Sequence, residues 1–432
     1  MTALDSKIDK TLQSFYSMFP GGVNSPVRAL VGLALAPLIV NRAYGDTFET
    51  IDEKRYVDFC LSWGALIHGH AHPYVNKCIK DQLDKGTSYG INSYPELLMA
   101  ENIQKAFPHM EQMRFTSSGT EATMAAIRLA RGVTKKPFII KFIGNYHGSS
   151  EALLVKAGSG VLHTQNTASS DGVLPGAVEN TLCLPYNDIS SVKEIFNLPQ
   201  YKDSIAAIIM EPIAGNMGVV PSSKDFIRII RKYCTKYQAL LIFDEVITGF
   251  RMRFGGMEVY YDVEPDLTCL GKIMGGGLPA ACFGGKKEWM RALAPEGQVY
   301  QGGTLSGNPA AMVAGCAALN LLEEDVYKQL QAKIDRLCLP IEAEIKEKNW
   351  NVCLQRVGSM FTLFFGTKAV HSMEDLNQVD LNVFKKYFHH MLERGIYISP
   401  SQYETCFISS VHSNENLDIT RELILEFLSN MY

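Results

Sequence analysis

The sequence lacks the features that mark several protein classes. Its 41 Lys and Arg are outnumbered by 45 Asp and Glu, so it has no basic excess of the kind that nucleic-acid-binding proteins carry. No apolar run approaches the roughly 20 residues of a membrane-spanning helix, since VGLALAPLIV (31–40) is short and contains Pro37. The N-terminus has neither the apolar core of a signal peptide nor the Arg-rich composition of a transit peptide. We therefore expect no nucleic-acid partner, no membrane association and a cytoplasmic location.

The ten cysteines also lack a recognisable arrangement. They are scattered, with no CxxC pair and no Cys/His spacing typical of zinc sites. This pattern indicates buried, reduced thiols of an intracellular protein, and no metal site.

The fold class follows from an alternation of short apolar runs with amphipathic segments. FIIKF (138–142), IAAIIM (205–210) and ALLIF (239–243) are typical of strands that are buried on both faces of a parallel sheet. Between the last two, SSKDFIRIIRKYCTKY (222–237) predicts a helix with Ser222 or Ser223 as its cap. This alternation of strands and helices predicts an α/β fold with a mostly parallel central sheet.

The pattern of expected helices and strands changes after about residue 320. A long helix (322–348), a strand in SMFTLFFG (359–366), a helix (380–394), a short strand (405–411) and a final helix predict a smaller α+β domain. Before the α/β region come a helix (3–18) and an extended stretch to about residue 65. We expect an N-terminal segment (1–65) that packs with the small domain, a large domain (66–320) and the small C-terminal domain (321–432).

Two sequence patterns carry side chains suited to a pyridine-type cofactor. In ALLIFDEVITGF, the apolar strand ends at Asp244, where ligands of parallel sheets bind and where an acid can pair with a protonated ring nitrogen. In LTCLGKIMGGGLPA, Lys272 lies between an apolar run and three glycines. A partly desolvated lysine there can lose its proton and form an imine. The alternatives are a strand-end cap for Asp244 and a solvated surface lysine for Lys272.

Two further patterns lie upstream. In RFTSSGTEATMAAIRLARG (114–132), Ser118, Gly119 and Thr120 begin a helix whose free N–H groups can hold a phosphate, although Ser118 with Glu121 also fits a plain capping box. In FIGNYHG (142–148), Tyr146 follows a strand and can stack on a planar ring, or it is simply a core or surface tyrosine. A phosphate cup, a stacking aromatic, a strand-end acid and an imine-forming lysine together indicate one cofactor site.

With these residues the chain resembles the class III aminotransferases, which belong to the fold type I pyridoxal-phosphate enzymes, and within them the glutamate-1-semialdehyde 2,1-aminomutases. The resemblance runs from about Pro20 to residue 320 and resumes near Ser399. The motifs that carry it are GGVNSPVRA (21–29), LSWG with GHAHP (61–73), SGTEATMAAIRLARG (118–132), LLVKAGSGV (153–161), LPYND (184–188), EPIAGNMGVVP (211–221) and GTLSGNP (303–309).

The resemblance implies pyridoxal 5'-phosphate, and its pyridoxamine phosphate form, as the cofactor in the large domain. It implies a role for each matching position. Lys272 would be the Schiff-base and proton-moving residue, Asp244 would pair with the pyridine nitrogen, Tyr146 would stack, Ser118, Gly119 and Thr120 would hold the phosphate, and Asn216 would lie near the ring hydroxyl. Thr304 would reach the phosphate of the neighbouring subunit, which implies a homodimer.

A second group of positions is implied to bind a small, amino-acid-like substrate. Arg28 and Ser25 would hold its carboxylate, Trp63 would line the pocket, and Glu404 and Ser159 would complete it. Residues 147–187 would form a lid. The implied reaction is an intramolecular amino transfer that turns glutamate 1-semialdehyde into 5-aminolevulinate, a step of tetrapyrrole (porphyrin) biosynthesis.

Two other functions remain open. An ordinary aminotransferase, or an amino-acid racemase or epimerase, would use the same lysine and cofactor and differ only in the later steps. A non-catalytic cofactor-binding protein is disfavoured because Lys272, Asp244 and Tyr146 are all present.

Overall fold

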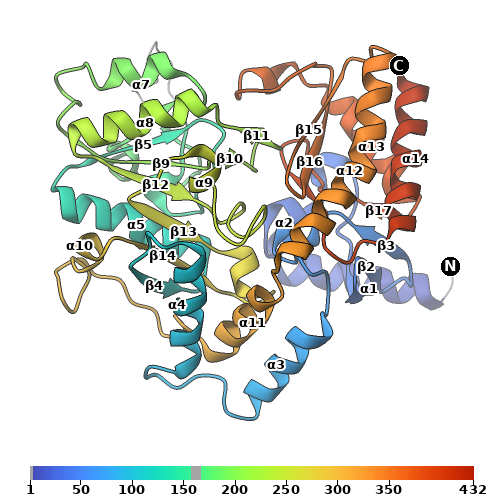
Figure 1. Ribbon diagram of the computed structural model, residues 1–432. Helices are drawn as coiled ribbons and strands as arrows, with labels where there is room; N and C mark the ends of the chain where they lie inside the picture. Colours follow the sequence, from blue (N-terminus) through green and yellow to red (C-terminus); the bar gives the residue numbers. More distant parts are fainter. Residues whose placement is uncertain (1–2, 157–166) are drawn as a thin grey trace. The chain divides into compact units, whose positions relative to one another are not determined.

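The computed structural model describes residues 3–156 and 167–432, which form two compact units (Figure 1). Unit 1 combines the chain up to His72 with Lys328–Val370 and Asn377–Tyr432. Unit 2 comprises Pro73–Tyr327 and His371–Leu376. Among the described residues, no helix has both the length and the apolar content that crossing a bilayer requires.

Unit 2 is built on a seven-stranded sheet. One strand, β14, runs antiparallel to both of its neighbours, and all other neighbouring pairs are parallel. The expected α/β class with a mostly parallel central sheet is therefore confirmed. The strand order is β4 (Gln112–Thr116), β14 (Ala281–Gly285), β13 (Leu267–Leu270), β12 (Leu240–Asp244), β9 (Ile205–Met210), β5 (Phe138–Phe142) and β8 (Thr181–Leu184).

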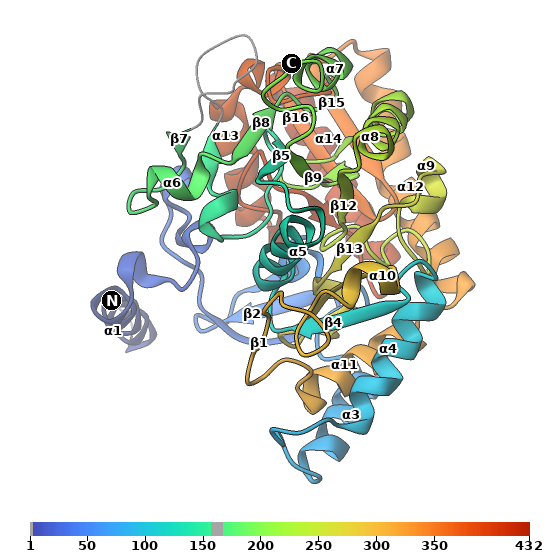
Figure 2. The ribbon, with the colours of Figure 1, turned by 90° about the vertical axis from the view of Figure 1, so that its left-hand side faces the viewer.

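The central strands form where the sequence is continuously apolar. Every residue of β9 and of β12 is buried, as expected for strands that are covered on both faces. Helix α5 (Gly119–Thr134) packs on β9, β13 and β14, and Figure 2 shows it in front of the sheet. Helix α8 (Lys224–Tyr237) packs on β9 and β12 and begins where the sequence predicts, with Ser223 Oγ accepting the N–H of Phe226 at 3.2 Å.

The other elements of unit 2 surround this sheet. They are α3 (Pro73–Leu83), α4 (Tyr94–Ala106), η4 (Glu151–Leu153), β6 (Val155–Lys156), β7 (Thr167–Ala168), α6 (Pro175–Val178), α7 (Ile189–Ile195), β10 (Ile213–Ala214), β11 (Val220–Pro221), α9 (Glu258–Tyr261), η5 (Lys272–Gly275), α10 (Lys287–Met290) and α11 (Pro309–Asn320).

Unit 1 contains two antiparallel-rich sheets and long helices, which confirms the α+β texture expected for the C-terminal part and for the N-terminal segment that joins it. One sheet has the order β1 (Val40–Tyr44), β2 (Thr47–Thr50), β3 (Arg55–Asp58), β17 (Ile396–Tyr397), and the other β15 (Val352–Val357), β16 (Met360–Phe365), β18 (Cys406–Phe407). The helices are α1 (Ala3–Met18), η1 (Pro20–Gly22), η2 (Pro26–Ala29), η3 (Val31–Leu33), α2 (Leu61–Gly64), α13 (Leu381–Glu393) and α14 (Asn414–Met431), with α12 (Glu324–Glu347) and η6 (Asp375–Gln378) crossing the unit limits.

Two local expectations in unit 1 were wrong. The stretch expected to be extended up to residue 65 is extended in β1, β2 and β3, but η1, η2, η3 and α2 interrupt it, and η1 and η2 each begin at a proline. The strand expected at 405–411 is only Cys406–Phe407, since β16 pairs with just these two residues.

Candidate active site

Five of the parallel strands of unit 2 end at the same edge of the sheet. Ser118 follows β4, Lys272 follows β13, Asp244 ends β12, Glu211 follows β9 and Tyr146 follows β5. Because parallel strands place their carboxyl ends together, these side chains belong to one edge, where ligands of α/β sheets bind.

Asp244 is held in place by a buried histidine. Its Oδ2 lies 2.7 Å from Nδ1 of His147, and its Oδ1 accepts the N–H of Val246 at 3.1 Å. Burial lowers the pKa of His147, although the Asp244 carboxylate opposes this. The imidazole is therefore neutral and donates Nδ1–H to Asp244. Sequence reasoning gave His147 no role, although its position beside Tyr146 in FIGNYHG was the available signal.

Glu211 is a second functional candidate that sequence reasoning missed. It is buried, and its Oε1 accepts the N–H of Tyr146 at 2.8 Å. Its Oε2 accepts the N–H of Gly215 at 2.8 Å and Nδ2 of Asn216 at 3.1 Å. Burial, reinforced by the charge of Asp244, raises the pKa of Glu211 to about 8. The side chain thus ties the expected stacking residue to the expected ring-hydroxyl partner. Glu211 directly follows the apolar strand β9, and the same pattern of an acid at the end of an apolar strand pointed to Asp244.

Tyr146 itself keeps a large accessible surface. Its side chain is 52% exposed, although its backbone is held by Glu211 and the next residue, His147, is buried. A planar ligand at this edge of the sheet can therefore reach the tyrosine ring.

The start of α5 shows both features that the sequence left open. The capping box is present: Ser118 Oγ accepts the N–H of Glu121 at 3.2 Å, and Glu121 Oε2 accepts the N–H of Ser118 at 3.1 Å. The N–H groups of Gly119 and Thr120 lie in the first turn, where the helix supplies no acceptor, so they point toward any anion bound there.

A loop crosses closely over this turn. Gly148 has φ +84°, and a Cβ at this position would lie 2.6 Å from Cα of Thr120. Thr120 Oγ1 also accepts the N–H of Ser149 at 3.2 Å. The loop that carries Tyr146 and His147 is therefore fixed against the helix start.

The loop that carries Lys272 meets the same point. A Cβ on Gly271 would lie 3.2 Å from Cγ1 of Val246, and one on Gly119 would lie 3.1 Å from its Cγ2. Val246 follows Asp244 by two residues, so Lys272, Asp244 and the start of α5 are neighbours. Lys272 has a left-handed backbone with φ 48°, the conformation in which it opens η5. The edge thus combines an amine, a buried carboxylate and a helix N-terminus, which suits a flat, phosphorylated heterocycle.

Thr304 lies elsewhere on unit 2. It is exposed and lines a hollow of about 400 Å³. Lys272, Asp244 and Tyr146 do not line this hollow. The residues that do are Ser88, Tyr89, Gly90, Ile91, Asn92, Ser93, Glu96, Gly303, Thr304, Ser306, Gly307, Asn308 and Pro309.

The remaining expected residues belong to unit 1. Arg28 is exposed and lies in η2, which begins directly after Ser25. The carbonyl of Ser25 accepts the N–H of Arg28 at 3.1 Å. Trp63 lies in α2, which packs on β18, and Glu404 precedes β18 by two residues. Trp63 and Glu404 therefore lie on neighbouring segments of unit 1. Ser159 lies outside the described residues, as do residues 157–166 of the expected lid.

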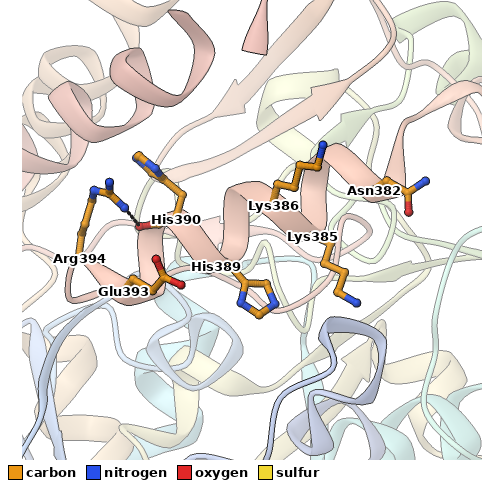
Figure 3. Close-up of a pocket in the computed structure, with 7 residues that line it drawn as sticks. All are labelled: Asn382, Lys385, Lys386, His389, His390, Glu393 and Arg394. Atoms are coloured by element: carbon orange, nitrogen blue, oxygen red, sulfur yellow. Dashed lines mark hydrogen bonds between the residues drawn. The ribbon is translucent and has the colours of Figure 1, made fainter. Parts of the chain in front are cut away.

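A larger hollow, of about 810 Å³, lies along α13 and is not a candidate site. The side chains that line it leave the helix in different directions and do not converge on one point, as Figure 3 shows. Arg394 donates Nη1–H to the carbonyl of His390 at 3.2 Å, and His390 Nε2 lies 3.1 Å from the carbonyl of Leu423. In the described part of the chain, no cluster of His, Cys, Asp or Glu is arranged to hold a metal ion either.

Comparison with known proteins identifies the family. The sequence profile of the class-III aminotransferases matches residues 32–431. A protein of Protochlamydia amoebophila (strain UWE25) that is named glutamate-1-semialdehyde 2,1-aminomutase is 51% identical over 425 residues, which cover 97% of this chain and 98% of that protein. An omega-transaminase from Sphaerobacter thermophilus matches with a TM-score of 0.89 at 29% identity, and a transaminase solved with PLP bound with 0.87 at 28%; in both cases 98% of this chain and 97% of the other are covered. These structures confirm the expected fold type I architecture. The chain belongs to the class-III aminotransferase family.

Proposed function

We propose that this protein is a pyridoxal-phosphate-dependent glutamate-1-semialdehyde 2,1-aminomutase, an isomerase that forms 5-aminolevulinate for tetrapyrrole biosynthesis. The observation that carries the proposal is the edge of the large sheet, where Lys272 neighbours the Asp244–His147 pair and the start of α5. The relative from Protochlamydia amoebophila, 51% identical over nearly the full length of both chains, supports the choice of reaction.

The residues at this edge fit the cofactor. Gly119 and Thr120, with Ser118, would hold its phosphate at the helix N-terminus. Tyr146 would stack on its ring, Asn216 would contact the ring hydroxyl, and Asp244 would pair with the ring nitrogen. When bound, pyridoxal phosphate supplies an electron sink and a carrier for the amino group, and its pyridoxamine form carries that group.

The protein's own groups then have separate tasks. Lys272 carries an amine that moves a proton to and from the substrate carbon. The neutral His147 donates a hydrogen bond to Asp244 and holds that carboxyl group in place. Substrate and product are isomers, so the reaction requires no external amino donor or acceptor.

We assign substrate binding to residues of unit 1 and to the expected lid. The guanidinium of Arg28, with Ser25, would grip the carboxylate of the substrate in two parallel contacts. Trp63 would line the pocket, and Glu404 and Ser159 would complete it. The expected lid of residues 147–187 is too wide, because His147 is buried beside Asp244 and Thr181–Leu184 form strand β8 of the central sheet. The role of excluding water is left to residues between these two anchors.

We further propose a cytoplasmic homodimer in which Thr304 contacts the cofactor phosphate of the partner subunit. Its exposed hydroxyl lines a hollow separate from the Lys272 edge, which supports a role toward a second chain. Ile91, which lines the hollow, is 80% exposed, and Tyr94, three residues further along the chain, is 70% exposed, as is typical of a subunit interface.

The decisive experiment is to supply purified protein with glutamate 1-semialdehyde and no amino donor or acceptor, and to measure 5-aminolevulinate. Rapid formation would establish the intramolecular transfer. Product that appears only after an amino donor is added would identify an ordinary aminotransferase. No product, despite bound cofactor seen by absorbance, would refute the proposed substrate and would lead to a screen for racemisation and transamination of amino acids.

A further inference from the structure

Unit 1 contains a run of four left-handed residues. Leu61, Ser62 and Trp63 have φ of 48°, 54° and 59°, and Gly64 continues the run with φ 81°. The left-handed conformation costs about 1–2 kcal/mol for each residue with a side chain. Such strain persists only where the surrounding structure enforces it, and it concentrates at functional positions.

Asp58 is the residue that holds this turn. It is buried, and its Oδ1 accepts the N–H of Cys60 at 2.8 Å and the N–H of Leu61 at 2.9 Å. These two N–H groups belong to the residue before the left-handed run and to its first residue. The carbonyl of Cys60 closes the turn by accepting the N–H of Gly64 at 3.0 Å.

The second oxygen of Asp58 is fixed by a histidine. Oδ2 of Asp58 lies 2.8 Å from Nε2 of His70. The backbone of His70 is paired with Gly45 in both directions, at 2.7 and 3.0 Å. The carboxylate therefore cannot rotate without breaking contacts to two separate segments, and its Oδ1 stays aimed at the turn.

The turn determines which way its side chains face. Leu61 is buried, and the turn packs on β18, whereas Ser62 is exposed and Trp63 is partly exposed. A right-handed turn with the same anchored Leu61 would send the indole of Trp63 in another direction. The strained backbone thus sets the orientation of Trp63 relative to the segment of Glu404.

We propose that Asp58, supported by His70, is a positioning residue that determines how well the substrate fits by holding the left-handed turn under Trp63. This inference rests on the proposed function, in which Trp63 lines the substrate pocket. Asp58 does not touch the substrate and acts through Trp63.

The turn itself is tested by Ser62→Gly, which does not depend on activity. Glycine adopts left-handed conformations without a steric cost, so the variant should unfold at a higher temperature than the wild type, by roughly 1–3 °C. The matched control is Ser14→Gly, because Ser14 is exposed in the right-handed helix α1, where glycine lowers stability. If Ser62→Gly lowers the unfolding temperature as the control does, the claim that the turn is strained would be refuted.

The positioning role is tested by Asp58→Ala and Asp58→Asn in the holoenzyme. Alanine removes both acceptor contacts, so we expect the KM for glutamate 1-semialdehyde to rise about tenfold or more with a smaller fall in kcat. Asparagine keeps one acceptor oxygen for the N–H groups and should restore most of the fit. The cofactor absorbance should stay unchanged in both variants, because the residues assigned to the cofactor belong to unit 2.

Other outcomes remain decisive. An unchanged KM in Asp58→Ala, or an Asp58→Asn variant that is no better, would overturn the positioning role. If Asp58→Ala does not fold, His70→Ala, which frees only Oδ2, should raise KM by a smaller factor, and a normal KM would again contradict the inference. A wild type that forms no 5-aminolevulinate would refute the proposed function and the substrate role of Asp58 with it, while the Ser62→Gly result would still decide the turn.

Discussion

At the scale of single residues, the two neighbouring acids that end β12 have opposite environments. Asp244 is paired with His147, whereas Glu245 accepts the N–H of Met257 at 2.8 Å and the hydroxyl of Thr248 at 2.9 Å. Burial, reinforced by the charge of Glu258, raises the pKa of Glu245 to about 8. Glu245 is therefore protonated at neutral pH and bonded to Met257 and Thr248, whereas Asp244 is bonded to His147.

The second acid predicts a pH dependence of stability. An unfolded glutamate loses its proton near pH 4.5 and buried Glu245 near pH 8, so its contribution is present below pH 4.5 and is lost as the pH rises to 8. Glu245→Gln should remove this loss, so its stability relative to the wild type should be higher at pH 8.5 than at pH 5. Urea unfolding at both values checks this, with the exposed Glu194→Gln as the control. Equal pH profiles for wild type and Glu245→Gln would contradict the buried, protonated state.

Lys272 carries the central catalytic prediction. Lys272→Ala should abolish turnover and change the absorbance of the bound cofactor, because no other amine is assigned to this edge. Lys135→Ala is a matched control, since Lys135 also has a left-handed backbone (φ 58°) but caps the far end of α5. Both variants replace a lysine by alanine at a residue with a left-handed backbone. Undiminished activity in Lys272→Ala would refute the catalytic role of Lys272. Lost activity in Lys135→Ala would show that this kind of substitution impairs folding.

At the scale of elements, two helices of unit 2 begin with the same cap but differ in their expected roles. Ser118 Oγ accepts the N–H of Glu121 at the start of α5, and Ser223 Oγ accepts the N–H of Phe226 at the start of α8, both at 3.2 Å. Losing such a cap costs about 1 kcal/mol. Comparing the first residues of these two helices therefore distinguishes a serine that only caps a helix from one that also binds phosphate.

Ser118→Ala and Ser223→Ala should lower stability by similar amounts, about 1 kcal/mol each. Only Ser118→Ala should also weaken cofactor binding, because it adds a lost phosphate contact to the lost cap. Titration of the apoenzyme with pyridoxal phosphate measures this difference. Equal cofactor affinity in the two variants would mean that Ser118 is a cap and nothing more.

The sequence predicts three of the seven strands of the large sheet, β5, β9 and β12, because a continuous apolar run as short as Ile205–Met210 is typical of a strand buried on both faces. It does not reveal the left-handed turn at Leu61, since neither Ser62 nor Trp63 is a residue that favours this conformation and Asp58 enforces it from outside. It also does not reveal Glu211 and His147 as site residues. Their local positions, His147 beside Tyr146 and Glu211 after an apolar strand, were signals, but their partners lie more than 60 residues away along the chain and cannot be identified from the local sequence.

At the scale of the whole molecule, the hollow around Thr304 predicts the oligomeric state. Ile91 lines this hollow and is 80% exposed, so Ile91→Asp should place a charge in the proposed interface. Sedimentation should then show monomers, with cofactor binding weakened because Thr304 no longer reaches a partner. Val259→Asp is the control, as Val259 is 60% exposed on α9 and does not line the hollow. A monomeric wild type, or a dimer that persists in Ile91→Asp, would contradict the proposal.

The division of the chain into two units affects the order in which its parts can fold during synthesis. Strand β3 pairs with β17 through Val57 and Ile396, so the first sheet of unit 1 is incomplete until almost the entire polypeptide has left the ribosome. At about 5–20 residues per second, Val57 waits roughly 20–70 s for its partner. Meanwhile the seven-stranded sheet of unit 2 is complete once residue 285 has emerged. The early part of unit 1 therefore spends roughly 20–70 s as a nascent chain with an unpaired strand edge, a state that exposes it to aggregation and to chaperone binding.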